Sequence, residues 1–386
     1  MNKLTKLLVI FIFLDFFSSY TINTLQGQTK EKREQNHGFT NVYENEQEWW
    51  NIPYPDRFDQ SVLKPQSKLS IKENLLVDEK DNKVVLKGFN VADISKLKLN
   101  KQWNEHLFKE LKDWGTNVVR IPIHPLSWRK HGKQWYFERL DEAVVWANKL
   151  GMYLIIDWHS IGNLKTAMYQ HPMYVTTVNE TMEFWRDISF RYKSVPTMAV
   201  YELFNEPTHD FIGNGAGSLG KITWEEWREL LESIVDIVQV YDPEVVCLVT
   251  GFNWGYDLSQ VMEHPIRRAQ IAYAIHPYPQ KAKVQEETIK NFQTKWQEQW
   301  GYVADKYPLM ATEFGWVKED GYGAHVPVIH NGNTYGPAII DFMKSRNISW
   351  TAWVFDPDWS PVIINDWDFT PSEQGAYLKS VLQEKE

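Results

Sequence analysis

Eight short runs of apolar residues recur along the chain, and each has the length and composition of a buried β-strand. Most of the segments between them repeat apolar residues at helical spacing and are bounded by capping or stop residues. In Asn104–Trp114, for example, the large apolar residues share one helical face, and Gly115 ends the pattern. We expect strands at Val85–Val91, Val118–His124, Tyr153–His159, Ala199–Asn205, Val245–Gly251, Ile271–His276, Leu309–Glu313 and Trp350–Phe355.

Strands and helical segments alternate, so that one strand and one helix form a repeating unit. Eight such units favour a closed (β/α)8 barrel of the α/β class, the TIM barrel. An open doubly wound sheet is the alternative, but no glycine-rich nucleotide-binding fingerprint follows any of the strands. The expected helices are Asn104–Trp114, Phe137–Leu150, Thr177–Tyr192, Thr223–Tyr241, a short one within 261–269, Glu287–Lys306, Tyr335–Ser345 and Glu373–Glu384.

The part of the chain ahead of the barrel differs from it in composition. Residues 1–27 combine two early lysines with the apolar stretch Leu7–Phe17, which is too short to span a bilayer and is typical of a secretory signal peptide. Residues 28–66 are polar with scattered prolines, and we expect a linker or an arm packed on the barrel domain, residues 67–386. The sequence thus predicts a secreted or periplasmic monomer with no membrane association once the signal is removed.

Turn residues predict a hairpin at the start of the domain and long loops after the barrel strands. Lys68–Asp78 and Lys83–Asn90 flank the polar tetrapeptide 79–82, which suggests a hairpin turn. Loops of the length seen after the strands are usually functional in a compact domain. The longest of them cover 159–176, 209–221, 317–333 and 356–374.

Charge and aromatic content narrow the classes of partner. The net charge of the 386 residues is −9 and there are no basic clusters, so nucleic acid is not an expected partner. The chain has 19 tryptophans and 18 tyrosines, more than core filling usually needs. Flat aromatic rings stack on the faces of pyranose sugars, and a sugar-binding cleft would account for the excess. The single cysteine, Cys247, lies in an apolar run and cannot form a disulfide within one chain.

One expected strand ends in a glutamate, and another is followed directly by one. Residues 198–207 run apolar until Asn205-Glu206-Pro207, where proline stops a central strand. Residues 309–316 run apolar until Glu313. One such glutamate could equally form a salt bridge at the sheet rim, but two at the carboxyl ends of barrel strands can face each other across the mouth. Glycoside hydrolysis requires such a pair, and we expect a separation of about 5–5.5 Å, which suits a covalent glycosyl-enzyme.

Other polar residues lie at the ends of the remaining strands. Glu202 shares the strand face of Glu206 by the period of two, and we expect it to form an ion pair in the barrel core. A lone histidine is more often a satisfied core residue than a site residue. Three histidines at strand ends on one expected face are harder to explain as coincidence. The strand-end residues are Arg120, His124, Asp157, His159, His276, Tyr278 and Trp353.

Together these residues resemble glycoside hydrolase family 5, a cellulase-like family of retaining glycosidases on (β/α)8 barrels. The resemblance covers roughly residues 68–384. Its most specific motif is Asn205-Glu206-Pro207, followed by the Thr-Glu-Phe-Gly sequence around Glu313. Arg120, His159 and the pair His276 and Tyr278 fall where the family places its site residues.

The resemblance implies a role for each residue at the centre of the site. Glu206 would be the acid/base and Glu313 the nucleophile. Asn205 would bind the sugar 2-hydroxyl, while Arg120 and Tyr278 would hold Glu313 ionised and oriented. A proton donor at neutral pH needs a raised pKa and a nucleophile a low one, which agrees with an arginine and a tyrosine beside Glu313.

The resemblance also implies the lining of the substrate cleft. His159 and His276 would line the cleavage subsite, with His124 beside them, and Trp353 would be the platform for a sugar ring. The implied substrate is a β-linked polysaccharide or oligosaccharide, cut internally at β-1,4 glucan linkages. The resemblance implies no cofactor and no metal.

Three alternatives remain open at this point. The first is a β-mannanase or another β-glycanase of the same family. The second is a metal-dependent barrel hydrolase that uses His124, Asp157, His159 and His276, although no His-x-His pair ends the first strand. The third is a non-catalytic glycan-binding barrel, which would need neither Glu206 nor Glu313.

Overall fold

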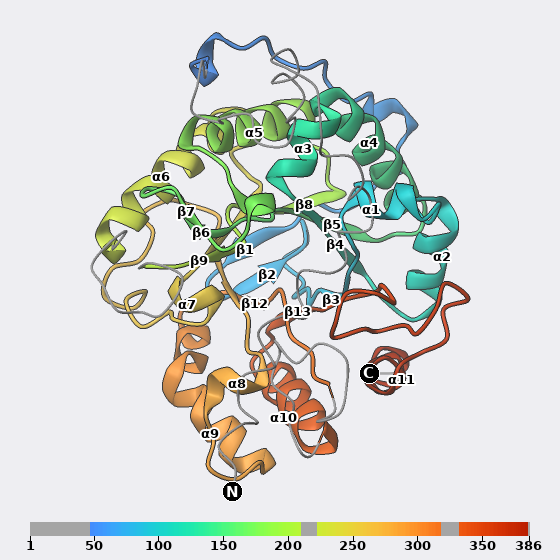
Figure 1. Ribbon diagram of the computed structural model, residues 1–386, viewed down its shortest axis with the longest axis vertical. Coiled ribbons are helices and arrows are strands. Elements are labelled where there is room, and N and C mark those ends of the chain that lie inside the picture. Colours follow the sequence, from blue (N-terminus) through green and yellow to red (C-terminus); the bar gives the residue numbers. More distant parts are fainter. Residues whose placement is uncertain (1–46, 210–221, 318–331, 385–386) are drawn as a thin grey trace, which may run out of the picture. The chain divides into compact units, whose positions relative to one another are not determined.

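A closed barrel of eight parallel strands forms the centre of the computed structural model, which describes residues 47–209, 222–317 and 332–384 (Figure 1). The strands follow one another around the barrel in chain order, and the barrel closes where β13 pairs with β3 through Trp350 and Lys87. The TIM barrel expected from the sequence is confirmed. The barrel strands are β3 Lys87–Asn90, β4 Val118–Ile123, β5 Tyr153–Trp158, β8 Met198–Glu202, β10 Val246–Thr250, β11 Ile271–Ile275, β12 Leu309–Ala311 and β13 Ser349–Ala352.

The interior of the barrel is apolar at one end and polar at the other. Side chains two residues apart on a strand point the same way, so Val118 and Arg120 on β4 both point inward, as do Val200 and Glu202 on β8. The first residue of each pair belongs to an apolar layer near the amino ends of the strands, and the second belongs to a polar layer near the carboxyl ends. The apolar layer contains Leu69, Leu76, Leu86, Val118, Ile155, Ala199, Val200, Val246, Leu248, Ala272, Ala274 and Met310.

Long helices surround the barrel, and several begin at capping residues that the sequence shows. Asn104 accepts a hydrogen bond from the Leu107 amide at 3.1 Å, and Thr223 and Glu226 form a complete capping box. The helices are α2 Glu105–Asp113, α4 Lys133–Lys149, α5 Val178–Arg191, α6 Trp224–Tyr241, α9 Ile289–Gln299, α10 Gly332–Ser345 and α11 Glu373–Gln383. Shorter helical pieces are α1 Ile94–Leu99, α3 Pro125–His131, α7 Phe252–Gly255, α8 Pro279–Ala282 and the 3₁₀ turns at Trp49–Asn51, Gln60–Val62, Pro172–Tyr174 and Gly301–Asp305.

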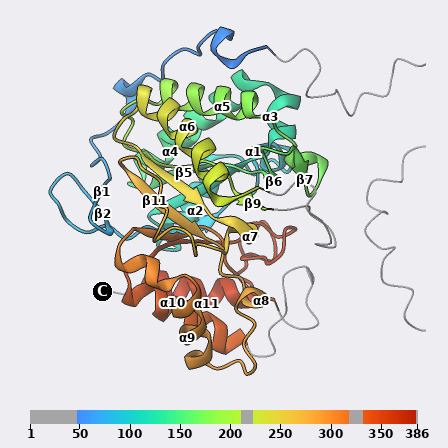
Figure 2. The same cartoon turned by 90° about the vertical axis from the view of Figure 1, so that its left-hand side faces the viewer.

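The N-terminal hairpin has the expected turn at 79–82, and the segment 68–78 contains an additional tight turn. Strands β1 Ser70–Lys72 and β2 Leu75–Val77 pair around Glu73 and Asn74, whereas 79–82 forms a second turn that brings Lys83 back to Val77. The hairpin covers the amino end of the barrel. A small sheet of β6 Ile161–Asn163, β7 Met168–Tyr169 and β9 Glu206–Pro207 lies at the opposite end (Figure 2).

Two further segments differ from the expectation. Residues 261–269 form turns instead of a short helix, and α4 begins at Lys133, four residues before the expected start. Gly132, with φ of +82°, separates α4 from α3. A left-handed residue cannot continue a right-handed helix, so one helical stretch becomes two.

Residues 47–66 lie against α5 of the barrel domain. Arg186 donates a hydrogen bond to the Ile52 carbonyl at 2.9 Å, and Arg191 donates one to the carbonyl of Asp56. The Phe58 amide bonds back to the Arg191 carbonyl at 3.0 Å. The expected signal peptide, 1–27, and most of the expected loops 209–221 and 317–333 fall outside the described residues. In the described parts, no helix has the length and apolar character to cross a membrane.

Candidate active site

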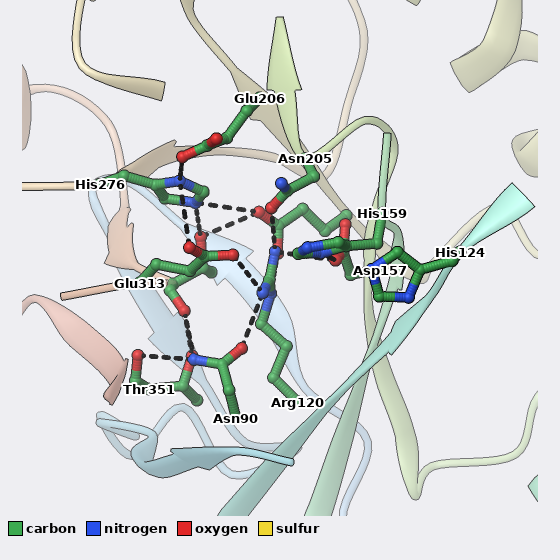
Figure 3. A network of polar contacts seen from close by, with 12 residues as sticks. Asn90, Arg120, His124, Asp157, His159, Asn205, Glu206, His276, Glu313 and Thr351 are labelled. Atoms are coloured by element: carbon green, nitrogen blue, oxygen red, sulfur yellow. Dashed lines mark hydrogen bonds and ion pairs between the residues drawn. The ribbon is translucent and has the colours of Figure 1, made fainter. Parts of the chain in front are cut away.

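The strand-end residues converge at the carboxyl end of the barrel, in the polar layer (Figure 3). Arg120 points inward from β4, and Glu206 lies four residues beyond the end of β8. The barrel strand ends at Glu202, three residues earlier than expected, and Glu206 and Pro207 form the separate strand β9, in which Glu206 pairs with Ile161 of β6 instead of with a barrel strand. This break turns the Glu206 side chain over the barrel mouth toward Glu313, which follows β12.

The two glutamates are close to each other and to one histidine. The Nδ1 atom of His276 lies 2.9 Å from Glu206 Oε1 and 3.9 Å from Glu313 Oε2. One carboxyl oxygen of each glutamate lies within 4.8 Å of the other. The exposed fractions of Glu206 and Glu313 are only 9% and 5%. Both carboxyl groups therefore work with little screening from bulk water.

Glu313 is held from two sides. The Tyr278 hydroxyl donates to Oε2 at 3.0 Å, and Arg120 donates to Oε1 at 3.0 Å. Burial nevertheless raises the pKa of Glu313 above its ordinary 4.5, against the opposing charges of His276 and Arg120. This differs from the low pKa expected for a nucleophile. The cause is the loss of solvent together with the nearby carboxylates of Glu206 and Glu202.

Arg120 is the centre of the polar layer and is fully buried. Its Nε donates to Glu202 at 2.6 Å, so the expected ion pair of Glu202 in the barrel core is confirmed. Burial disfavours the charge on Arg120, but the surrounding carboxylates outweigh this effect and raise its pKa. The remaining partners of the guanidinium are Asn90 at 2.7 Å, Asn205 at 2.7 Å, Asp157 at 3.0 Å and Glu313 at 3.0 Å.

The other histidines occupy different depths. His159 lies in the cleft with its Nδ1 2.6 Å from Asp157 Oδ2, and burial together with the charges of His124 and Arg120 holds its pKa well below the usual value. His124 packs behind it, with ring centroids 4.6 Å apart, and its Nδ1 contacts Asp93 at 3.1 Å. Neither His124 nor His276 lines the cleft itself.

Aromatic side chains line a cleft of about 560 Å³ that also contains the two glutamates. Trp353 follows β13, and its ring lies nearly parallel to that of His159 at 11° and 5.5 Å. Trp254 of α7 lines the cleft too, and its Nε1 donates to Gln170 at 2.8 Å. Lys281 lies 4.8 Å from the Trp254 ring centroid.

The sequence did not point to Trp254 and Lys281, which lie in the short helical pieces α7 and α8 and not at strand ends. Asn253 and Trp254 have left-handed φ values of +56° and +55°, which neither residue type announces. Asn90, the arginine partner on β3, could have been found, since it is a polar residue at the carboxyl end of an expected strand, as His276 is.

A family model for cellulases, described as glycosyl hydrolase family 5, matches residues 77–358. The chain belongs to glycoside hydrolase family 5. It is therefore a glycoside hydrolase. The resemblance inferred from the strand-end motifs is confirmed.

The relatives of this family 5 chain include two bacterial endoglucanases and a solved β-glucanase. The chain is 24% identical over 299 residues to endoglucanase 5 of Pectobacterium carotovorum subsp. carotovorum, with 75% of this chain and 51% of that protein covered. Endoglucanase N of Pectobacterium atrosepticum is also 24% identical, with 75% and 58% covered. The chain thus spans little more than half the length of these curated relatives.

The structure of β-glucanase SdGluc5_26A from Saccharophagus degradans is 56% identical to this family 5 chain, with a TM-score of 0.82. The match covers 87% of this chain and 98% of that one. A second structure of the same β-glucanase holds cellotetraose and is likewise 56% identical with a TM-score of 0.82, covering 86% of this chain and 98% of that one.

One group in this family 5 site has metal-ligand spacing. Among the described residues, Glu206, His276 and Glu313 are the group whose ligand atoms approach within 4.8 Å of one another. Burial alone would lower the pKa of His276, but the carboxylates of Glu313, Glu202 and Glu206 raise it to about 10. A protonated imidazole has no lone pair to offer a cation, so this group suits proton transfer better than metal binding.

Proposed function

We propose that this family 5 enzyme is a retaining endo-β-glucanase that hydrolyses β-1,4-linked glucan by double displacement. Glu313 is the nucleophile and Glu206 is the acid/base. The observation that carries the proposal is the approach of the two carboxyl groups, with one oxygen of each within 4.8 Å of the other. Retaining glycosidases place their carboxyl groups about 5–5.5 Å apart, whereas inverting enzymes need about 6.5–9.5 Å to admit a water.

The reaction proceeds in two displacements at the anomeric carbon. In the first, a Glu313 oxygen bonds to the anomeric carbon while Glu206 gives its proton to the departing glycosidic oxygen. In the second, Glu206 removes a proton from water, the water oxygen bonds to the anomeric carbon, and the bond to Glu313 breaks. Two inversions leave the β configuration unchanged.

The surrounding residues orient the sugar and the nucleophile. Tyr278 and Arg120 fix both oxygens of Glu313, so that its attacking lone pair has a set direction. The amide nitrogen of Asn205 is buried without a hydrogen-bond partner and lies at the cleft, where a sugar 2-hydroxyl would satisfy it. His159, with its lowered pKa, binds hydroxyls as a neutral imidazole, and Trp353 stacks on the sugar ring.

The substrate assignment draws on the relatives and on the aromatic cleft. The curated relatives are endoglucanases, and the solved β-glucanase binds cellotetraose. A reducing-sugar screen should compare soluble cellulose, mixed-linkage β-glucan, β-1,3-glucan and mannan. We expect release from the β-1,4-containing glucans, with soluble cellulose losing viscosity early. Release from mannan alone would replace the glucanase assignment by a mannanase.

The stereochemistry of the first product tests the mechanism. Proton NMR during hydrolysis of a β-linked oligosaccharide should show the β-anomer first. Glu313→Ala should abolish turnover, and azide should restore part of it as an α-glycosyl azide, because the small anion fills the place of the lost carboxylate. An α-anomer as the first product would mean inversion and would remove the nucleophile role from Glu313.

A further inference from the structure

A line of hydrogen bonds runs from the acid/base Glu206 into the barrel interior (Figure 3). Glu206 Oε1 meets His276 Nδ1 at 2.9 Å, and His276 Nε2 meets the Thr312 hydroxyl at 3.0 Å. The Thr312 hydroxyl meets Glu202 Oε1 at 2.9 Å. His276, Thr312 and Glu202 are fully buried, so water does not compete for these bonds.

The hydrogen-bond partners of Glu202, at the inner end of this line, determine which atoms carry the protons. Glu202 accepts a hydrogen bond from Arg120 at 2.6 Å, and a carboxylate beside a guanidinium accepts hydrogen bonds only. Burial disfavours the charge of Glu202, but Arg120 and His276 outweigh it and lower the pKa. The single hydroxyl proton of Thr312 therefore points at Glu202. Its oxygen can then only accept from His276, which places a proton on Nε2.

The outer end of the line follows from this placement. We propose that Thr312 and Glu202 are positioning residues that keep a proton on His276 Nε2, so that Glu206 and His276 Nδ1 share one proton. The inference rests on the proposed acid/base role of Glu206. With Nε2 occupied, the shared proton lies on Glu206, or it lies on Nδ1 beside an ionised Glu206. In either case the pair holds one proton before the first step.

The shared proton connects the two displacements. In the first step it goes to the leaving glycosidic oxygen, the bond from that oxygen to the anomeric carbon breaks, and the bond to Glu313 forms. An ionised Glu206 then faces the bare lone pair of Nδ1 at 2.9 Å. That repulsion raises the proton affinity of the pair. In the second step the pair takes one proton from water, the remaining hydroxide oxygen bonds to the anomeric carbon, and the bond to Glu313 breaks.

The charges around His276 agree with a pair that keeps its proton. Glu206, Glu202 and Glu313 approach the ring nitrogens at 2.9, 3.7 and 3.9 Å. α7 brings no charged group to the ring, because its four residues carry no charge and it is Gly255 that lies against the imidazole. Against burial, the three carboxylates raise the pKa of His276 to about 10. Further charged or titratable groups around it are Arg120, Asp157, His159 and Tyr278.

Thr312→Val tests the proposal through the pH dependence of catalysis. Without the hydroxyl, His276 can move its proton to Nδ1 and donate it to an ionised Glu206, which weakens Glu206 as an acid. We expect the basic limb of kcat/KM on a cello-oligosaccharide to move down by about one pH unit and kcat at neutral pH to fall about tenfold. Hydrolysis of a dinitrophenyl cellobioside needs no proton in the first step, so its kcat/KM should change little.

Two further variants separate the relay from packing. Thr312→Ser keeps the hydroxyl, so the basic limb of kcat/KM should lie at the same pH as in the wild type. Thr351→Val removes a hydroxyl that is equally buried and donates to the Thr312 carbonyl at 2.7 Å, outside the line to His276. It should leave the basic limb in place. The proposal would be overturned if Thr312→Val lowered kcat/KM equally on both substrates and left the basic limb of the pH profile unmoved. It would also be overturned if Thr351→Val shifted the basic limb as much as Thr312→Val does.

Nitrogen-15 NMR of histidine-labelled wild-type enzyme gives a readout that does not depend on activity. The His276 signals are assigned by their absence in His276→Gln. We expect Nε2 to stay protonated from pH 5 to 9, whereas Nδ1 should become the protonated nitrogen in Thr312→Val. A neutral His276 with its proton on Nδ1 in the wild type would overturn the inference even if hydrolysis retains the β configuration. Inversion at the anomeric centre would instead overturn the proposed function and leave the histidine result standing.

Discussion

At the scale of single residues, the raised pKa of Glu313 has a measurable consequence. The nucleophile has to be ionised, so activity is lost as the pH falls through the pKa of Glu313, and burial places that pKa above 4.5. Tyr278→Phe removes a donor to the ionised carboxylate, which raises the pKa further. We expect the acid limb of kcat/KM to move up by about one pH unit.

The control for this shift is Tyr335→Phe. Tyr335 is also fully buried, but its hydroxyl donates to the Pro277 carbonyl and not to a carboxylate. Its loss should leave the acid limb where it is. If the acid limb of kcat/KM in Tyr278→Phe is unchanged or moves to lower pH, the tyrosine does not stabilise the ionised Glu313.

Trp353 tests whether the aromatic wall of the cleft binds sugar. The ring lines the cleft parallel to His159 and is 9% exposed, whereas Trp296 lies wholly in the core. Trp353→Ala should lower kcat/KM by about tenfold or more with little change in thermal stability, since a stacking surface acts on the bound transition state. Trp296→Ala should cost roughly 3–5 kcal/mol of stability. A Trp353→Ala protein that unfolds early but keeps its specific activity would make Trp353 a core residue.

Strand-end chemistry was readable from the sequence because a strand fixes both the position and the direction of its last side chain. Arg120 lies two residues after Val118 on β4, and Glu202 lies two residues after Val200 on β8. Both side chains therefore point into the barrel, where they form an ion pair. The pKa of Glu313 was not readable, since it depends on how much water the folded site excludes. The bond between Thr312 and His276 was hidden for a related reason. It needs the distance between two strands, and no residue pattern encodes that distance.

At the scale of elements, the turn that carries α7 supports the site. Gly255 has φ of +70°, and a Cβ placed there would come within 2.9 Å of the His276 ring. Gly255→Ala should therefore cost about 1–2 kcal/mol of stability through its backbone and should also displace His276. Gly151 has a similar φ of +67° with nothing within 4 Å of the added Cβ.

The two glycine variants form a matched pair. Gly151→Ala should lose a similar amount of stability in thermal unfolding and keep its turnover number, whereas Gly255→Ala should lose turnover at temperatures where it is still folded. Equal activity in both variants would mean that the turn can move away from His276 without consequence.

Element boundaries were predicted best where a side chain caps or stops the chain. Asn104 and Thr223 begin helices as their side chains predict, and Gly115 follows α2. The additional turn at Glu73 and Asn74 was missed because Glu73 adopts φ of +57°, a conformation that glutamate rarely takes. The polar stretch 79–82 has the composition of a turn, and it forms the turn that was expected there.

At the scale of the whole molecule, the N-terminal sequence predicts export. The prediction rests on residues 1–27, in which lysines precede an apolar stretch. Mass spectrometry of the protein made from the full chain should find a mature N-terminus at roughly residues 20–30. Replacing Leu8 and Ile10 by aspartate should keep the chain in the cytoplasm with Met1 intact, because charge disrupts the apolar segment. An intact Met1 in the unaltered protein would contradict export.

The seam between β3 and β13 sets the moment at which this protein can fold. Ribosomes make β3 early and its partner β13 close to the end, so a growing chain holds an unclosed sheet with two bare edges until Ala352 has emerged. Pairing between such distant segments is slow, because the entropy of loop closure has to be overcome before the contact gives any stabilisation. Passage through a protein-conducting channel requires an unfolded chain. For the export predicted above, a barrel whose last strand pairs with its first would help to meet this requirement, because the sheet closes only after β13 has been made.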